Sequence, residues 1–364
     1  MHTLHYKPSD SDCLCRVIFG NTLANIDNTV SDVVQSYRSL LFIVDDALPE
    51  EYVNIVEDIL KLKSSAHVKI NANKKTLDKV EVIWDAMVET VPDAAVVIGG
   101  GTVCDLAGVA CANYQRGIPR ILFPTTVMAM VDASIGGKSG IDYQNVKNAV
   151  GAIHYPPLVI NYLPFLKSLA DEEYFSGFSE IVKAAVLYDK NFFDDLLKLT
   201  KDNAFLRSRE VINVLARSAQ IKASICEQGR GKTSLLYGHA IGHALEASGK
   251  VKLRHGDCVS IGMHIEGAIA CELGIWNQKE WHQQHQLLQQ LHLPTGMSRS
   301  VTINEISKKM LLYKKLVDSK NYLLVLPREV GRVNNAESTY LTAIPRDKFE
   351  GLLKDVIRTL SSSA

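Results

Sequence analysis

The sequence lacks an excess of charge of either sign, and it lacks any long run of apolar residues. Its 40 basic and 40 acidic residues give a formal net charge of zero. This balance argues against a broad nucleic-acid or anionic-membrane surface, but it leaves room for a local basic pocket that binds a small anion. No apolar run is long enough to span a bilayer, and residues 1–7 lack the apolar segment of a secretory signal. We therefore expect neither a nucleic-acid partner nor a membrane partner.

Cysteine is sparse, and the sequence has no CxxC pair. The seven cysteines are odd in number and scattered through probable core segments. Cys13 and Cys15 are separated by a single residue, which is too close for them to bridge comfortably. This usage is typical of reduced thiols, so we expect a cytoplasmic protein.

Short apolar runs alternate with helical patterns in the first half of the chain. The apolar runs lie at residues 39–44, 94–98, 121–123 and 158–160. Such runs are typical of buried parallel strands, and alternation of strands with helices predicts an α/β Rossmann-like domain with a parallel sheet. Beyond residue 163 long helical runs dominate. At 364 residues the chain is long enough for two domains, and we place an α/β domain at 1–163 and a mainly α-helical domain at 164–364.

Three consecutive glycines, Gly99, Gly100 and Gly101, follow the predicted strand at 94–98 and open a helical segment. Without side chains, the backbone N–H groups there can approach a pyrophosphate closely, at the positive end of a helix dipole. The spacing is not GxGxxG, however. Taken alone, the stretch is at least as consistent with a tight turn as with a dinucleotide-binding site.

The segment 124–148 combines glycines and hydroxyl side chains with two lysines. This composition suits a loop around an oxyanion, with Lys138 and Lys147 as point charges and Asn148 as a neutral donor. The residue five before Gly137 is Asp132, so the P-loop spacing fails and we exclude an NTPase. A flexible polar linker is the alternative.

Histidines mark the second half. His239 and His243 lie four residues apart beside an apolar helical stripe, so they point the same way, and His255 follows. Such a set suits a Zn²⁺-like cation, which often takes one carboxylate as well. Glu180 could supply it, because an ionised carboxylate is costly in so apolar a helix. The alternatives are surface or core histidines and a surface ion pair of Glu180 with Lys183.

Set side by side in collinear order, these motifs resemble the 3-dehydroquinate synthase family, the sugar-phosphate cyclases. The match covers most of the chain. It comprises Gly99-Gly100-Gly101 with Asp105, Asp105-Leu106-Ala107-Gly108 with Arg116-Gly117, Pro124-Thr125-Thr126, Asp132 to Lys138, Lys147-Asn148, Glu180 with Lys183, Gly238-His239 to Gly242-His243, and His255-Gly256.

The resemblance implies an NAD⁺- and divalent-metal-dependent enzyme, a carbon–oxygen lyase that eliminates phosphate and closes a carbocycle. It makes 1–163 the NAD-binding domain and 164–364 the metal- and substrate-binding domain. The implied ligands of Zn²⁺ or Co²⁺ are Glu180, His239 and His255. The implied NAD⁺ contacts are Asp45, Lys75, Gly99, Gly100, Gly101, Asp105, Thr125, Thr126, Lys138 and Lys147. The implied catalytic and phosphate-holding residues are Arg116, Asp132, Lys138, Asn148, Lys183 and His243. Further substrate contacts fall at Lys222, Lys232 and one of Lys314 or Lys315.

The resemblance also implies a homodimer, with Arg116 reaching the neighbouring subunit's site, and a small phosphorylated sugar or keto acid as substrate. Leu236 stands where the family has an asparagine, and Tyr313 where it has an acidic residue. Residues 71–74 lack the family's acidic ribose contact, and the connection from Lys222 to His239 is short. Tyr237 is more like the 2-deoxy-scyllo-inosose synthase branch, whereas 132–142 looks like dehydroquinate synthase itself, so the branch stays open.

Two other functions remain compatible with the sequence. One is an NAD- and metal-dependent polyol dehydrogenase that releases NADH. The other is a degenerate homologue that acts as a binding or scaffold protein, which the intact set Glu180, His239 and His255 disfavours.

Overall fold

The computed structural model describes every residue except 24–25, 27–29, 31–32, 62–65, 145, 230–232, 251, 299, 314–315, 335–338 and 363–364. The chain forms two compact units, and each is described by itself. The first comprises Met1–Tyr174 with Arg209–Gly229, and the second comprises Phe175–Ser208 with Arg230–Ala364. The division expected from the sequence, at residue 163, differs from these units chiefly at helix α9 (Val211–Gln228), which packs on strands β1 (His2–Tyr6) and β2 (Cys15–Gly20) of the first unit.

A seven-stranded sheet forms the centre of the first unit. Its strand order is β1-β2-β9-β6-β5-β3-β4, and all neighbouring strands run parallel except the edge pair β1–β2. The further bounds are β3 Leu40–Asp45, β4 Ala66–Ile70, β5 Ala94–Gly99, β6 Arg120–Pro124 and β9 Leu158–Tyr162. The predicted parallel α/β sheet is confirmed, and the four apolar runs lie in β3, β5, β6 and β9.

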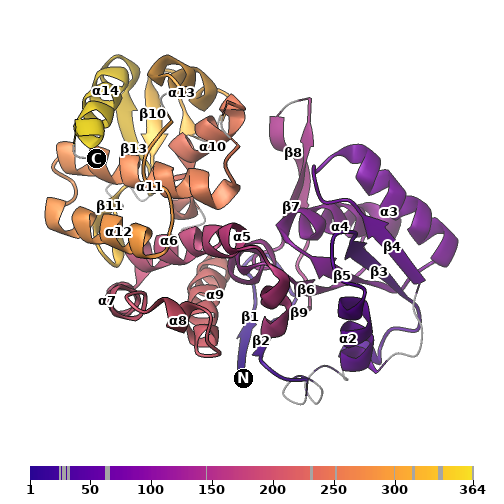
Figure 1. The fold of residues 1–364 in the computed structure, drawn as a ribbon. Helices are drawn as coiled ribbons and strands as arrows, with labels where there is room; N and C mark the ends of the chain where they lie inside the picture. Colours follow the sequence, from indigo (N-terminus) through magenta and orange to yellow (C-terminus); the bar gives the residue numbers. More distant parts are fainter. Residues whose placement is uncertain are drawn as a thin grey trace. The chain divides into compact units, whose positions relative to one another are not determined.

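Helices cover both faces of this sheet (Figure 1). Helix α2 (Glu51–Leu60) packs on one face, where its buried side chains join Phe42, Val96 and Phe123 in one hydrophobic cluster. Helices α3 (Leu77–Thr90) and α4 (Gly101–Asn113) pack on the other face. Because the helices that follow β3 and β5 leave on opposite faces, a crevice is expected between the carboxyl ends of these two strands, where open α/β sheets bind ligands.

A two-stranded hairpin stands beside α4. It consists of β7 (Lys138–Tyr143) and β8 (Val146–Ile153). A π-helical turn, η2 (Ala129–Ala133), connects the end of β6 to this hairpin and also contacts α9. The remaining short helices of this part are η1 (Tyr114–Arg116) and η3 (Leu163–Ser168), and the boundary between the units falls within α5 (Asp171–Ser176).

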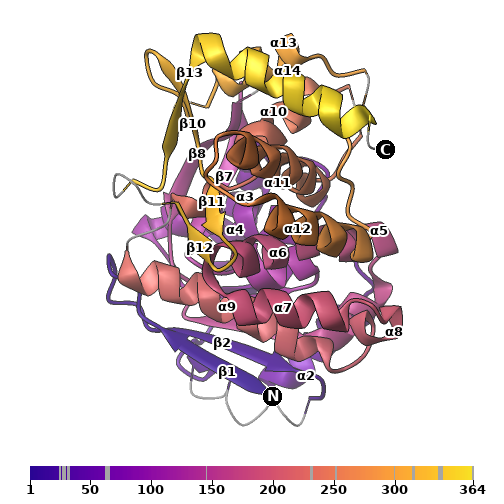
Figure 2. The ribbon, with the colours of Figure 1, turned by 90° about the vertical axis from the view of Figure 1, so that its left-hand side faces the viewer.

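The second unit is mainly α-helical, as predicted. Helix α11 (His255–Glu272) is its centre, because its residues from Gly256 to Ala270 are buried on every side. Figure 2 shows α7 (Lys190–Leu199), α12 (Gln278–Gln290), α11 and α14 (Arg346–Ser362) in succession, each in contact with the next. The other elements are α6 Phe178–Tyr188, α8 Asn203–Leu206, η4 Ser234–Leu236, α10 His239–Ser248, α13 Ile303–Met310, and the strand pairs β10 Asn321–Leu324 with β13 Thr342–Pro345 and β11 Pro327–Glu329 with β12 Arg332–Val333.

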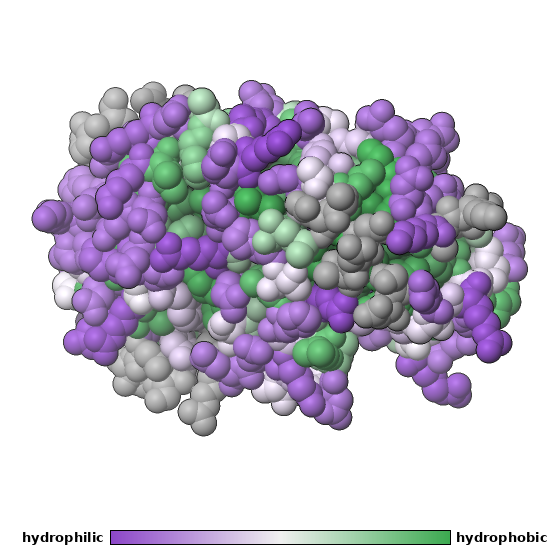
Figure 3. Space-filling model, turned by 90° about the horizontal axis from the view of Figure 1, so that it is seen from below, coloured by the Kyte–Doolittle hydropathy of each residue, from purple (hydrophilic) through white to green (hydrophobic). Residues whose placement is uncertain are grey.

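The surface mixes polar and apolar side chains. The face in Figure 3 is mostly hydrophilic, with smaller hydrophobic clusters between. Among the described residues, no helix combines the length and the apolar character that crossing a membrane requires.

Candidate functional site

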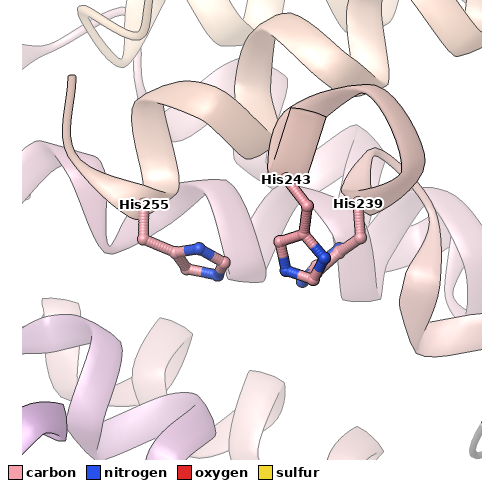
Figure 4. Close-up of side chains that lie close together, drawn as sticks. All are labelled: His239, His243 and His255. Carbon is pink, nitrogen blue, oxygen red and sulfur yellow. The ribbon is translucent and has the colours of Figure 1, made fainter. Parts of the chain in front are cut away.

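Three histidines of the second unit converge (Figure 4). His239 and His243 lie one turn apart at the start of α10, and His255 is the first residue of α11. The ring centroids are 5.1, 5.4 and 5.8 Å apart, and one potential ligand atom of each ring lies within 4.8 Å of the others. Within the part of the chain that the structure describes, no other three histidine, cysteine, aspartate or glutamate side chains come together in this way.

Glycines allow the two histidine helices to approach. Gly238 precedes His239 with φ +76°, and a Cβ atom there would lie 2.7 Å from the Val259 carbonyl oxygen of α11. A Cβ atom on Gly262 would lie 2.0 Å from the Gly238 carbonyl oxygen. Only glycine tolerates both the backbone conformation and these contacts. The sequence therefore brings the start of α10 against the second turn of α11.

Neighbouring acceptors orient two of the imidazoles. His239 Nδ1 lies 3.0 Å from the carbonyl oxygen of Tyr237, and His255 Nδ1 lies 3.4 Å from Glu246 Oε2. Donation from Nδ1–H leaves Nε2 of each ring as the metal-binding atom, a second-sphere arrangement common among zinc ligands. Burial, followed by the charge of Lys183 and the other two histidines, lowers the pKa of His239 well below its usual range. The neutral ring that results is the ligating form.

Glu180 lies against this group from α6. Its side chain is 3% exposed, its Oε2 is paired with Lys183, and its Oε1 lies 3.7 Å from His239 Nε2. Among the described residues Glu180 Oε1 has no hydrogen-bond partner. Two ligands of a tetrahedral Zn²⁺ ion lie about 3.4 Å apart, so the spacing and the orphaned oxygen both fit a metal. Because Glu180 and Lys183 are each only 3% exposed, the alternative of a surface ion pair is wrong.

His243 is partly buried, as is His255, whereas His239 is buried. The His243 ring stacks on Tyr313, with centroids 4.9 Å apart. The Tyr313 hydroxyl also lies 3.5 Å from the His243 carbonyl oxygen, within reach as a donor. Leu236, the other departure from the family pattern, ends η4 and is half-buried. The predicted substrate contacts Lys232, Lys314 and Lys315 lie outside the described residues.

Glu266 is a buried carboxylate beside the candidate site that the sequence interpretation missed. It is fully buried in α11, and its carboxylate accepts the N–H of Gly238 at 2.7 Å and that of Ile241 at 3.1 Å. It therefore caps the helix that begins with His239. Burial raises the pKa of Glu266 to about 8, and the backbone hydrogen bonds oppose that shift. The signal was present, since a lone carboxylate in an apolar helix needs partners whether it is Glu180 or Glu266.

In the first unit, several predicted NAD⁺ contacts gather at the carboxyl ends of adjacent strands. Asp45 ends β3, Gly99 ends β5, and Thr125 follows β6. The Thr125 N–H donates to the Gly99 carbonyl oxygen at 3.0 Å, and a Cβ atom on Gly100 would lie 3.1 Å from Thr126 Cγ2. Gly101 then begins α4. This arrangement of strand ends, a glycine turn and the N-terminus of a helix is typical of sites that bind a pyrophosphate.

Lys75, Asp105 and Asn148 form a second group in this unit. Lys75 Nζ donates to Asp105 Oδ2 at 2.8 Å and to Asn148 Oδ1 at 2.6 Å. Burial raises the pKa of Asp105, although Lys75 opposes the shift. Asn148 itself adopts φ +48° and donates its N–H to Asp142 Oδ1 at 2.9 Å. Residues predicted for the cofactor and for phosphate thus lie together.

Asp132 and Lys222 form a third group. Lys222 on α9 is paired with the Asp132 carboxylate and donates to the Asp132 carbonyl oxygen at 2.7 Å. Asp132 lies in the π-helical turn, a form often found at functional sites. The remaining predicted residues lie on the hairpin and a turn: Lys138 is exposed at the start of β7, Lys147 is half-buried in β8, and Arg116 is exposed in η1 with φ +71°.

Two family models match the chain in succession. The model for the 3-dehydroquinate synthase N-terminal part matches residues 65–176, and the model for the C-terminal part matches 177–316. The 3-dehydroquinate synthase of Nostoc punctiforme is 34% identical over 290 residues, which cover 77% of this chain and 78% of that protein. That of Crocosphaera subtropica is 30% identical over 344 residues, covering 91% and 94%.

Solved structures share the fold. A 2-deoxy-scyllo-inosose synthase complexed with carbaglucose-6-phosphate, NAD⁺ and Co²⁺ matches with a TM-score of 0.85 at 22% identity, over 98% of this chain and 99% of that one. The 2-epi-5-epi-valiolone synthase of Streptomyces hygroscopicus, with NAD⁺ and Zn²⁺ bound, matches with a TM-score of 0.80 at 22% identity, over 96% and 97%. An iron-containing alcohol dehydrogenase from Corynebacterium glutamicum matches with a TM-score of 0.64 at 16% identity, over 98% of both chains.

Proposed function

Since the chain belongs to the 3-dehydroquinate synthase family, we propose that it uses NAD⁺ and a divalent metal to eliminate phosphate from a seven-carbon keto acid phosphate and close a carbocycle. The observation that carries this proposal is the convergence of Glu180, His239 and His255 in the second unit. Lys183 pairs with one oxygen of the buried Glu180 carboxylate, but the other, Oε1, has no hydrogen-bond partner among the described residues. A bound metal would supply that partner, so the set supports catalysis over a scaffold role.

Glu180, His239 and His255 would hold the metal, which is Co²⁺ or Zn²⁺ in the two cyclase structures of the same fold. The turn of Gly99, Gly100 and Gly101 and the neighbouring strand ends would hold NAD⁺, which both of those structures contain. When bound, the metal lowers the pKa of a substrate hydroxyl and polarises a carbonyl, while NAD⁺ accepts and returns a hydride and so is not consumed.

The chain's own side chains would bind the substrate and move its protons. His243, whose ring centroid lies 5.1 Å from that of His239 and 5.8 Å from that of His255, is placed to exchange protons with the substrate. Lys183 keeps its ammonium group beside Glu180, where it would also attract the leaving phosphate. Lys138, Lys147 and Asn148 would hold phosphate or cofactor from the hairpin, and Lys222, positioned by Asp132, would bind a substrate carboxylate.

Sequence identity favours the seven-carbon keto acid phosphate, because the curated relatives at 30–34% identity are 3-dehydroquinate synthases. Leu236 and Tyr313 support the alternative, a specialised sugar phosphate, since neither side chain reproduces the polar contact expected at its position. A phosphate-release assay with the seven-carbon keto acid phosphate, glucose 6-phosphate and sedoheptulose 7-phosphate tests the choice. We expect release from the first. Release from one of the others alone would assign the secondary-metabolism branch.

The same assay distinguishes a cyclase from a polyol dehydrogenase. A cyclase releases phosphate without net accumulation of NADH, whereas a dehydrogenase accumulates NADH and releases no phosphate. The likeness to an alcohol dehydrogenase, at 16% identity, concerns the fold alone. A degenerate homologue would show neither product and would purify without bound metal.

We further propose that the protein acts as a cytoplasmic homodimer. All seven cysteines are free thiols, as expected in a reducing compartment. Arg116 is exposed on a turn with positive φ, where its side chain could reach a second subunit. Analytical ultracentrifugation tests the assembly. If the dimer is real and Arg116 completes the neighbouring site, an equimolar mixture of inactive Arg116→Ala and inactive His239→Ala subunits should regain part of the activity.

A further inference from the structure

Cys13 and Cys15 lie side by side at the start of β2 in the first unit. Their Sγ atoms are 3.9 Å apart. Cys15 is fully buried, whereas Cys13 is half-buried and lines a cavity of about 530 Å³ together with Asp10, His154 and Tyr155. One thiol is therefore within reach of small molecules and the other is held behind it.

The hydrogen bonds of the pair make the two thiols unequal. The Cys15 S–H donates to Cys13 Sγ, and Cys13 Sγ also lies 3.8 Å from the Tyr155 carbonyl oxygen. The bond from Cys15 lowers the pKa of Cys13 to about 7, and the same bond together with burial raises the pKa of Cys15. An accessible thiolate with a protonated thiol beside it matches the attacking and resolving members of a redox pair.

We propose that Cys13 and Cys15 are a redox-modification site, at which a hydroperoxide oxidises Cys13 and Cys15 then closes a reversible disulfide. In the first step the Cys13 thiolate attacks a peroxide oxygen, the O–O bond breaks, and the released hydroxide or alkoxide takes up a proton. Cys13 is thereby oxidised to sulfenic acid. In the second step the Cys15 sulfur attacks the Cys13 sulfur, the S–O bond breaks, and water leaves with the Cys15 proton.

The short spacing makes this disulfide reversible. With only Leu14 between the two cysteines the ring is strained, and strained disulfides are the readily reduced ones. A dithiol reductant should therefore restore both thiols.

Oxidation of the two cysteines should weaken a hydrogen bond that holds the loop leading to Lys138. The buried Tyr6 hydroxyl is a hydrogen-bonding neighbour of Cys15 and accepts the Gly136 N–H at 3.0 Å. Gly136 has φ +89° and stands two residues before Lys138. Drawing the Cys15 sulfur towards Cys13 removes it from Tyr6, so the hydrogen bond to Gly136 should open more often.

Cys226 provides the competing partner. It lies on α9 near the same loop, since a Cβ atom on Gly136 would be 2.9 Å from Cys226 Sγ. Among the described residues, however, these three cysteines do not bring their sulfur atoms together as a metal site would require. The arrangement thus favours a disulfide between Cys13 and Cys15 over a bound thiophilic metal.

Hydrogen peroxide treatment of the full-length protein tests the proposal. After alkylation and digestion, we expect the wild-type peptide that contains Cys13 and Cys15 to have lost the mass of two hydrogen atoms, and to recover it with dithiothreitol. Cys15→Ser should stop at a sulfenic acid that dimedone traps on Cys13, and Cys13→Ser should form neither product. Cys226→Ser is the matched control and should form the disulfide as the wild type does.

A Cys13 that stays reduced, or a disulfide that joins Cys226 to either thiol, would overturn the site. Hydrogen exchange at the Gly136 amide tests the link to the loop. Oxidation should speed this exchange in the wild type, whereas in Tyr6→Phe the exchange should already be fast and oxidation should add nothing. An unchanged wild-type exchange rate would reject the link.

Discussion

Glu266 accepts the backbone N–H of Gly238 across 2.7 Å, inside the second unit and directly before the metal-ligand candidate His239. The same carboxylate accepts the N–H of Ile241, so one buried side chain satisfies two donors of the first turn of α10. Its helix, α11, also begins with His255. Glu266 therefore ties the start of α10 to the middle of α11, the helix whose first residue is His255.

We expect Glu266→Ala to lower the affinity for Zn²⁺ or Co²⁺ by about 10- to 100-fold, as losses of second-sphere partners commonly do. Two buried N–H groups would lose their acceptor, at about 1–3 kcal/mol each, and His239 would lose its fixed position. Metal competition titration measures the affinity, and the visible spectrum of the Co²⁺ form reports the ligand geometry.

Glu266→Gln is the matched control, because it keeps one acceptor oxygen in the same place. It should retain more of the metal affinity and more of the wild-type Co²⁺ spectrum than Glu266→Ala does. If both variants bind metal as the wild type does while losing the same stability, Glu266 serves packing alone.

Removing a ligand should have a different effect from removing a phosphate contact. His239→Ala should abolish metal binding, because it deletes a ligating nitrogen next to the orphaned Glu180 oxygen. Lys138→Ala should leave the metal content unchanged but raise the KM for the phosphorylated substrate, since Lys138 lies on the exposed start of β7. Atomic absorption on both purified variants checks the first half. Equal metal in His239→Ala and wild type would remove the ligand assignment.

A substitution at Gly108 tests the packing of the first unit independently of the proposed catalytic activity. The Arg120 side chain is 2% exposed and crosses Gly108, so a Cβ atom there would lie 1.7 Å from Arg120 Nη1. Arg120 also donates to Ser139 Oγ at 2.8 Å and to the His154 carbonyl oxygen at 2.7 Å, which fastens the hairpin of β7 and β8. We expect Gly108→Ala to cost about 3 kcal/mol or more in the free energy of unfolding.

Gly351 in α14 is the control for that substitution, because nothing lies within 4 Å of its hypothetical Cβ atom. Gly351→Ala should stabilise the protein by about 0.5–1 kcal/mol through helix propensity. Urea denaturation of both variants provides the comparison, and similar small effects at the two positions would refute the described path of Arg120.

The strands that could be predicted from the sequence are those that consist of continuous apolar residues because both of their faces are buried. The run at 94–98 is apolar because β5 is covered on both faces. Strand β4 was missed because it lies at the sheet edge, where its residues Ala66 to Lys69 are exposed or half-exposed. The place of α9 in the first unit was not predictable from local patterns either, because the chain returns to that unit after an excursion of several helices.

In the candidate site too, features set by local geometry could be predicted, whereas features set by the packing of distant segments could not. The spacing of His239 and His243 predicts that they share a helix face, since this depends on local geometry alone. Their meeting with Glu180 depends on the packing of α6 and α10 against α11, and no spacing reports it. Arg120 was missed because an arginine at the start of a strand reads as a surface residue, although the structure buries it.

His264 provides a pH-dependent test of the second unit. It is 4% exposed on α11, and its ring stacks on Trp281 and His285 of α12, with centroids 5.0 and 4.5 Å away. Burial, followed by the charges of His285 and His282, lowers the pKa of His264 to about 3. Its Nδ1 has no hydrogen-bond partner among the described residues, so protonation would bury an unpaired N–H group.

The sign of the effect follows from proton binding. Between about pH 3 and 6.5 the unfolded chain carries a proton on His264 that the folded chain does not, so stability increases with pH across this window and is lost as the pH falls. At about pH 5 the loss should approach 2 kcal/mol, from 1.36 kcal/mol per pH unit below the unfolded pKa.

His264→Phe keeps a stacked ring without a titrating group, so urea denaturation should show a shallower decline between pH 7 and 5 than in the wild type. His282→Gln, on the exposed side of α12, should keep most of the wild-type decline. A His264→Phe protein that loses stability as steeply as the wild type would show that another group controls the acid response, since His239, whose pKa burial also lowers, and any carboxylate with a lowered folded-state pKa give a decline of the same sign.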